Sequence, residues 1–256
     1  MPMGGTRLAA HRGGALLWPE NSLLAFRNAI ALGADFLELD VHLSKDGEVV
    51  VIHDAMLPRT TTGAGAVRER TLADLRALRL KDKDGEVTEE TVPSLEEVAA
   101  LAAPSPLGLL LEVKLDARRV PYRRIEEKLL AILDRHELAG RTIVMSFEPE
   151  TVRRIRQLRP EVRAGVLYSP RTLRQRRWSV RSAIDELAEY GGAFVGLQES
   201  LVTAETVELA RDRSLLLAVW TVNEADAMRR FISLGVDVLV TDRPDLAKEL
   251  LKEERL

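Results

Sequence analysis

The chain has 256 residues, which suits one closed β/α barrel, and its 46% hydrophobic and 30% charged residues exclude a disordered chain. Its 37 basic and 40 acidic side chains give a net charge of −3, which excludes a uniformly basic nucleic-acid-binding surface. Cysteine is absent, which excludes disulfides, thiolate metal sites and a cysteine nucleophile.

Short apolar segments that favour strands alternate with longer segments that favour helices along the whole chain. This alternation is typical of a parallel sheet whose strands are joined by helices. Eight strands are expected, at residues 7–11, 35–42, 107–114, 142–146, 162–167, 193–196, 215–221 and 236–241. Eight such units predict an α/β fold with a single (β/α)8 TIM barrel, formed by one domain over residues 1–256. An open, doubly wound sheet is the alternative.

Helices are expected between the strands, for example at residues 22–32, 122–136, 149–158, 204–212, 224–234 and 245–252. The connection between the second and third strands is unusually long. It contains a hairpin-like segment at 43–53, a Thr/Gly loop and short helices near 72–78 and 94–101. Long excursions from a compact barrel usually carry function, so we expect this one to cover the C-terminal face, where active sites of this fold lie.

The strongest apolar windows, residues 107–111 and 215–220, are far too short to span a bilayer. Residues 1–7 carry no apolar run of signal-peptide length. We therefore expect a soluble, cytoplasmic protein without stable membrane association. The sequence pattern leaves open whether it is a monomer or a homodimer.

Polar and apolar residues alternate strictly in the second expected strand. Glu38, Asp40 and His42 share one face of this strand, while leucine and valine occupy the other. Helices cover the outer face of a β/α barrel and side chains crowd the inner one, so two carboxylates inside the barrel need a cation. The third expected strand adds Glu112 and Lys114 on one face. They form either a buried ion pair, or a third oxygen ligand for Mg²⁺ or Ca²⁺ beside a lysine that faces a phosphate.

Three of the four histidines, His11, His42 and His53, lie in the first fifth of the chain, at or near expected strand ends. Histidines in such places are candidates for proton transfer. His136 follows a helix without acidic neighbours, and we interpret it as a surface or C-cap residue. Few histidines and no cysteine argue against a zinc site.

The first strand ends in His11-Arg12-Gly13-Gly14, a general acid/base candidate followed by a guanidinium suited to phosphate and by two glycines that allow close approach. Either Asn21 or Ser22 is expected to cap the next helix. The arginine-rich run at residues 171–181 is interpreted as a solvated helix face near a phosphate pocket rather than as a nucleic-acid surface.

Ten short motifs in this order resemble those of the glycerophosphodiester phosphodiesterases, and together they cover nearly the whole chain. They are His11-Arg12-Gly13, Pro19-Glu20-Asn21-Ser22, Glu38-Leu39-Asp40-Val41, Lys45-Asp46-Gly47, His53-Asp54, Val92-Pro93-Ser94-Leu95-Glu96-Glu97-Val98, Glu112-Val113-Lys114, Trp220-Thr221-Val222-Asn223, Gly235-Val236-Asp237 and Thr241-Asp242-Arg243-Pro244. Between residues 163 and 199 the match is loose, so no site residue is assigned there.

The resemblance implies a role for each matching position. His11 and His53 correspond to the family's acid/base pair, and Arg12 and Lys114 to its phosphate contacts. The implied ligands of one divalent cation, Mg²⁺ or Ca²⁺, are Glu38, Asp40 and Glu112.

Other implied roles concern the edge of the site. Trp220 corresponds to an aromatic residue beside the substrate, although packing at the barrel rim is an equal alternative. His42 lies where the family varies and is placed behind the site. Residues 241–244 are interpreted only as a helix start.

The expected activity is metal-dependent hydrolysis of a small glycerophosphodiester, such as glycerophosphocholine or glycerophosphoethanolamine, to glycerol 3-phosphate and an alcohol. Three alternatives stay open. They are a lysophospholipase D-like enzyme, a lyase similar to the phosphatidylinositol-specific phospholipases C, and a catalytically silent barrel that binds phosphate esters.

Overall fold

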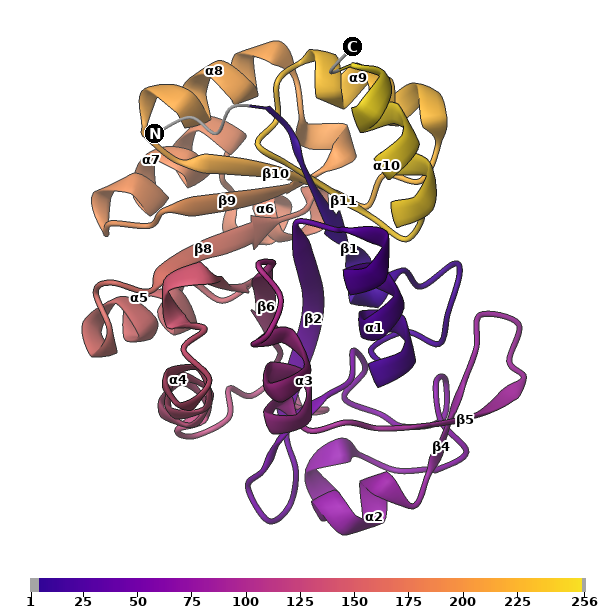
Figure 1. The fold of residues 1–256 in the computed structure, drawn as a ribbon. Helices are drawn as coiled ribbons and strands as arrows, with labels where there is room; N and C mark the ends of the chain where they lie inside the picture. The colour runs from indigo at the N-terminus through magenta and orange to yellow at the C-terminus, as the bar shows by residue number, and fades with distance from the viewer. Residues whose placement is uncertain (1–4, 255–256) are drawn as a thin grey trace.

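Eight parallel strands close on themselves in the order β1-β11-β10-β9-β8-β7-β6-β2, and β2 pairs with β1 to complete the barrel (Figure 1). These strands are β1 (Arg7–Ala10), β2 (Phe36–Leu43), β6 (Gly108–Val113), β7 (Thr142–Ser146), β8 (Arg163–Tyr168), β9 (Phe194–Gln198), β10 (Leu216–Trp220) and β11 (Val238–Thr241). The computed structural model describes residues 5–254. The expectation about residues 1–7 therefore lies partly outside the described residues.

The TIM barrel predicted from the alternation is confirmed, and the open sheet is excluded. The predicted helix ends agree with the structure to within a few residues, although no range was predicted between residues 170 and 189, and helices of the barrel follow the strands throughout. They are α1 (Leu23–Leu32), α3 (Leu95–Ala102), α4 (Ile125–Arg135), α5 (Pro149–Leu158), α6 (Pro170–Arg176), α7 (Val180–Glu189), α8 (Ala204–Asp212), α9 (Ala225–Ser233) and α10 (Pro244–Glu253). Short 3₁₀ helices lie at His11–Gly13, Val67–Glu69, Ala139–Arg141 and Glu199–Leu201. Within residues 5–254, no helix is both long enough and apolar enough to cross a membrane.

The long connection leaves the barrel at the carboxyl end of β2. It returns at once as β3 (Val49–Val51), which pairs antiparallel with β2, as the hairpin-like sequence predicted. Beyond it lie α2 (Leu72–Arg76) and a two-stranded sheet of β4 (Arg79–Lys81) and β5 (Val87–Thr91) that the sequence analysis missed. A small apolar core of its own, including Ile52, Leu57 and Leu75, holds the excursion together.

The barrel has an inner and an outer apolar layer. Phe36, Leu110 and Phe194 belong to the inner layer, whereas Leu37 and Leu39 belong to the larger layer between strands and helices. Neighbouring residues on one strand thus face opposite layers, as the alternation in β2 predicted. The polar residues of β2 are therefore enclosed by the barrel.

Gly165 on β8 allows the close approach of β9. A Cβ atom on this residue would lie 1.9 Å from the carbonyl oxygen of Phe194, a backbone atom that cannot rotate away. We expect Gly165→Ala to lower the free energy of unfolding by about 3 kcal/mol or more, in the manner of an overpacked core. Urea unfolding measures this loss of stability. Gly140→Ala is the control, because a Cβ on Gly140 meets no atom within 4 Å. Equal stability of the two variants would contradict the prediction.

Candidate active site

Three carboxylates meet inside the barrel at the carboxyl ends of β2 and β6. Asp40 is in register with Glu112 on the neighbouring strand, and Glu38 lies one inward-facing position before Asp40. One oxygen of each carboxylate lies within 4.8 Å of the other two, and all three residues are buried. The sequence analysis had expected this set to act together, and the structure brings its members together.

The charges of this cluster are unequal because the surroundings of its members differ. Burial, together with repulsion by Asp40 and Glu112, raises the pKa of Glu38 to about 7. Burial also acts to raise the pKa of Asp40, but Lys114, His53 and Arg12 outweigh it and keep that pKa well below its usual range. Glu38 therefore holds a proton more readily than Asp40 does. An oxygen-only donor set of this kind fits Mg²⁺ or Ca²⁺.

Lys114 and Arg12 supply positive charge beside Asp40. The Lys114 ammonium lies 2.9 Å from Asp40 Oδ1 and 2.6 Å from Glu112 Oε1, so the ion pair considered as an alternative for Glu112 is present. Burial acts to lower the pKa of Lys114, but these two carboxylates outweigh it and raise that pKa. Arg12 Nε lies 3.4 Å from Asp40 Oδ2.

The turn after β1 fixes the place of Arg12. Arg12 has φ 51° and its backbone N–H donates to Glu38 Oε2 at 2.9 Å. At Gly13, with φ 83°, a Cβ atom would lie 2.7 Å from the Cβ of Ala25 in α1, so only glycine fits. Of the two candidate caps, Ser22 is the one that caps this helix, because its side chain accepts a hydrogen bond from Ala25 N–H. Asn21 instead donates to Asp40.

His11 directly follows β1 and turns one ring nitrogen towards the carboxylates. Its Nδ1 lies 2.6 Å from Asp242 Oδ1, and its Nε2 lies 3.9 Å from Glu38 Oε2. Asn223 holds Asp242 in place, donating from its amide to Oδ2 and accepting the Asp242 N–H. A carboxylate can only accept, so neutral His11 carries its proton on Nδ1 and leaves Nε2 free. Burial acts to lower the pKa of His11, but Glu38 and Asp242 outweigh it and raise that pKa.

Removing the Asp242 charge is expected to lower the pKa of His11. If His11 is active in its protonated form, the falling limb of the kcat/KM pH profile moves to lower pH. If His11 is active in its deprotonated form, the rising limb moves to lower pH. Asp242→Asn should therefore shift one limb to lower pH and reduce kcat roughly 10²-fold, since the ring also loses its orienting partner. Steady-state kinetics between pH 5 and 9 test this. Asp226→Asn, on exposed α9, is the control, and an unshifted profile for Asp242→Asn would refute the expectation.

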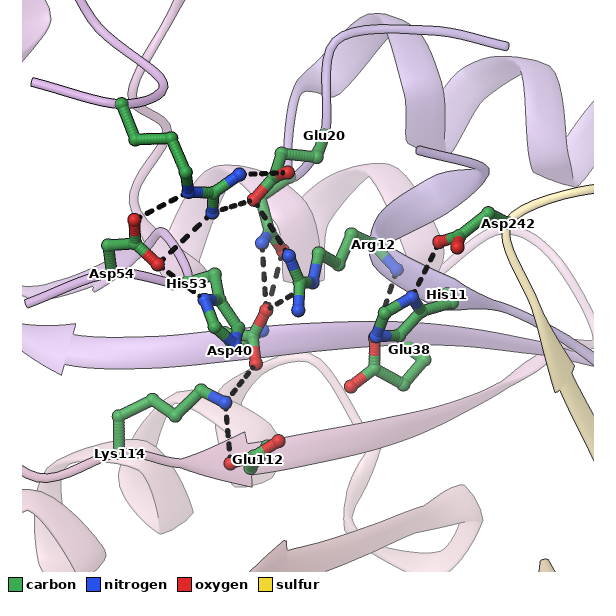
Figure 2. Close-up of polar contacts among 12 residues, drawn as sticks. His11, Arg12, Glu20, Glu38, Asp40, His53, Asp54, Glu112, Lys114 and Asp242 are labelled. Carbon is green, nitrogen blue, oxygen red and sulfur yellow. Dashed lines mark hydrogen bonds and ion pairs between the residues drawn. The ribbon is translucent and has the colours of Figure 1, made fainter. Parts of the chain in front are cut away.

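His53 reaches the cluster from the excursion, on the side opposite His11 (Figure 2). Its Nδ1 lies 2.6 Å from Asp54 Oδ1, and this hydrogen bond lowers the pKa of Asp54. Arg59 donates to both Asp54 and Glu20, and Glu20 in turn accepts from Arg12 at 3.1 Å. A chain of ion pairs thus links the excursion to the turn after β1.

His42 lies behind the site, as expected from the sequence. Its Nε2 lies 3.0 Å from the carbonyl oxygen of His53 and its Nδ1 lies 2.9 Å from the hydroxyl of Tyr122. The carbonyl can only accept, so Nε2 donates and the tyrosine hydroxyl donates to Nδ1. Burial lowers the pKa of His42 to about 4, so the ring is neutral at pH 7. His136 is the C-cap residue of α4, as expected, but the expectation that it has no acidic neighbour was wrong, because α3 brings Glu96 to 2.7 Å from its Nε2.

Cavities lie at both ends of the barrel. A hollow of about 960 Å³ lies at the amino ends of the strands, beside Arg7, Arg163 and Leu216, far from the carboxylates. A pocket of about 360 Å³ opens at the carboxyl ends of β6, β7 and β8 and includes Glu112 and Lys114. Only the second cavity touches the candidate site, which agrees with the end at which barrels of this type carry their sites.

Trp220 ends β10 half-buried and packs edge-on against Phe147, with ring centroids 5.6 Å apart. Its indole N–H has no hydrogen-bond partner among residues 5–254. Packing at the barrel rim is therefore present, and the expected contact with substrate stays a prediction.

Two groups of site residues were not predicted from the sequence. Residues 241–244 were interpreted only as a helix start. α10 does begin at Pro244, but Asp242 also binds His11. Glu20 and Arg59 were missed as well. Asp242 follows a strand of the barrel directly, a signal that could have been used, whereas no local pattern marks Arg59.

Residues 11–246 match the model of the glycerophosphoryl diester phosphodiesterase family. The chain is 33% identical over 249 residues to a glycerophosphodiester phosphodiesterase of Caldanaerobacter subterraneus subsp. tengcongensis, covering 97% of this chain and 98% of the relative. A putative glycerophosphoryl diester phosphodiesterase structure from Agrobacterium tumefaciens superposes with a TM-score of 0.89 at 28% identity, covering 98% of this chain and 99% of that one. A phosphodiesterase from Oleispira antarctica, solved in complex with the product sn-glycerol-3-phosphate, gives a TM-score of 0.80 at 26% identity, covering 97% of each chain.

Proposed function

Because the chain belongs to the glycerophosphoryl diester phosphodiesterase family, we propose that it hydrolyses small glycerophosphodiesters such as glycerophosphocholine or glycerophosphoethanolamine to sn-glycerol 3-phosphate and an alcohol. The observation that carries this substrate class is the placement of two histidines on either side of a buried three-carboxylate cluster. The sn-glycerol-3-phosphate in the Oleispira antarctica structure supports it. We propose likewise that residues 1–256 act as one domain.

The carboxylates of Glu38, Asp40 and Glu112 would hold one divalent cation, Mg²⁺ or Ca²⁺. Support for this comes from their common burial, from oxygen atoms within 4.8 Å of one another, and from the burial and mutual repulsion that together raise the pKa of Glu38 to about 7. The cation would neutralise charge on the nonbridging phosphate oxygens. All other chemistry falls to side chains of this chain.

His11 and His53 would transfer the protons. Either the oxygen of a water molecule bonds to phosphorus while the bond from phosphorus to the alcohol oxygen breaks, or the glycerol 2-hydroxyl attacks first and water then opens the resulting cyclic phosphate. In both routes one histidine takes a proton from the attacking oxygen, and the other gives a proton to the departing alkoxide. The Nδ1 atoms are engaged by Asp242 and Asp54, so each ring has its Nε2 available for this step.

Arg12 and Lys114 would contact the nonbridging phosphate oxygens. Both already lie at Asp40, within 3.4 Å and 2.9 Å, so their positive charges are fixed before substrate arrives. A charge placed in advance costs no reorganisation when the transition state forms. Trp220 would flank the substrate at the end of β10.

The test is release of sn-glycerol 3-phosphate from glycerophosphocholine and glycerophosphoethanolamine by purified protein, first with EDTA and then with Mg²⁺ or Ca²⁺ restored. Metal-restored release is the expected result. Activity on micellar lysolipid or inositol lipid, but not on soluble diesters, would replace the proposal by the lysophospholipase D-like or phospholipase C-like alternative. Phosphate-ester binding without turnover of any substrate would indicate the silent barrel.

A further inference from the structure

The pocket of about 360 Å³ at the ends of β6, β7 and β8 continues the candidate site away from His11. It begins at Glu112 and Lys114, which Figure 2 shows beside Asp40, and extends to the first residues of α6. His11, His53 and Arg12 do not line it. A phosphate held between the two histidines would therefore lie at the mouth of this pocket, and one of its two ester arms would lie inside.

The charged groups of the pocket are not balanced. Of its three acidic residues, Glu112 is paired with Lys114, and Asp116 is paired with Arg68 and accepts the backbone N–H groups of residues 118 and 120. The third, Glu148, lies 3.4 Å from Arg176. The side chains of Arg119 and Arg171, by contrast, make no hydrogen bond or ion pair within residues 5–254. Two exposed arginines of the pocket lining thus keep free donors.

Aromatic residues contribute little to this pocket. Phe147 is the one aromatic side chain among its lining residues, whereas a quaternary ammonium group is bound by several aromatic faces. The uncharged lining instead offers the side-chain amide of Gln175, whereas the hydroxyl of Thr172 is engaged by Ser169 in the cap of α6. The lining suits an anion that carries hydroxyl groups, since guanidinium pairs with phosphate or carboxylate in a bidentate manner.

We propose that this pocket binds the alcohol arm of the substrate and selects alcohols that carry an anionic group of their own, such as a second phosphate. The glycerol arm of every glycerophosphodiester is uncharged, so only the alcohol arm can match Arg119 and Arg171. The inference rests on the proposed function and specifies its substrate class.

Two substrates that differ only by one terminal phosphate test the proposal: glycerophosphoglycerol and glycerophosphoglycerophosphate. Hydrolysis of the second adds the oxygen of water to the diester phosphorus, breaks the bond to the second glycerol and protonates that oxygen. Glycerophosphoglycerophosphate then yields two glycerol phosphates, whereas glycerophosphoglycerol yields one glycerol phosphate and glycerol. We expect the terminal phosphate to raise kcat/KM about tenfold or more at low salt, and the ratio to fall as salt is added.

Arg171→Gln is expected to reduce this ratio about fivefold or more, whereas Arg174→Gln, in the same helix but outside the pocket lining, should keep the ratio of the unmodified protein. A ratio near one for the unmodified protein, or a ratio unaffected by Arg171→Gln, would overturn the proposal.

Failure of the proposed function gives a different result. If neither diester is hydrolysed, the function is wrong, and calorimetric binding of the two diesters then decides the inference alone. Tighter binding of glycerophosphoglycerophosphate than of glycerophosphoglycerol, if Arg171→Gln abolishes the difference, supports the anion pocket. Equal binding of the two compounds would contradict the anion pocket.

Discussion

His53→Ala and His11→Ala are each expected to reduce kcat on glycerophosphocholine by about 10²- to 10⁴-fold, the usual effect of removing a general acid or base. The reason is geometric. Each ring is oriented through Nδ1 by a carboxylate at 2.6 Å, which leaves Nε2 free for proton transfer. His136→Ala is the matched control, because His136 pairs with Glu96 at the end of α4 and should leave kcat unchanged.

An activated leaving group separates the two histidines. A 4-nitrophenyl ester of glycerol 3-phosphate releases a stable anion that needs no proton from the enzyme, so loss of the acid is partly rescued while loss of the base is not. We expect one of the two variants to recover most of its activity on this ester. Similar defects on both substrates for both variants would contradict the division of roles.

Glu112→Gln is expected to weaken the binding of Mg²⁺ or Ca²⁺ about 10²-fold and to remove metal-restored activity. The substitution keeps the shape of the side chain but removes one of the three charges that would hold the ion. Calorimetric titration of the EDTA-treated protein measures binding without relying on turnover. The ion that binds more tightly and restores activity identifies the cofactor.

Thermal unfolding gives a second readout. An ion that binds only the folded protein raises Tm, and this rise should be lost in Glu112→Gln. Glu208→Gln is the control, because Glu208 is an exposed residue of α8, and this variant should keep the full rise in Tm. Undiminished ion binding by Glu112→Gln would remove this residue from the ligand set.

Much of the fold was predictable because its signals are local. The alternation of Glu38, Asp40 and His42 with apolar residues fixed both the strand and the face that carries the carboxylates. The segments that became β7, α5 and α8 have the predicted limits because a short apolar run or an amphipathic helix needs only its own residues to be recognised.

The rest depends on contacts between distant residues. His11 and Asp242 are 231 positions apart, and Arg59 binds Glu20 across 39 positions. Neither pair leaves a trace in the spacing of the sequence. β4 and β5 were missed for another reason: they are short, and β5 is Val-Thr-Glu-Glu-Thr, which contains a single apolar residue.

The pairing of β1 with β11 has a consequence for the order in which the enzyme is synthesised and folds. Ala10 is in register with Thr241, so the carboxylate that orients His11 comes into place only when the final strand joins the first. A ribosome-bound chain from which residue 242 has not yet emerged contains nearly all of the site residues, but its His11 lacks the carboxylate that orients the ring. We therefore expect catalytic activity to appear abruptly, and only after the last strand of the barrel has been synthesised. Refolding enzyme is likewise expected to regain turnover only in the step that pairs β11 with β1.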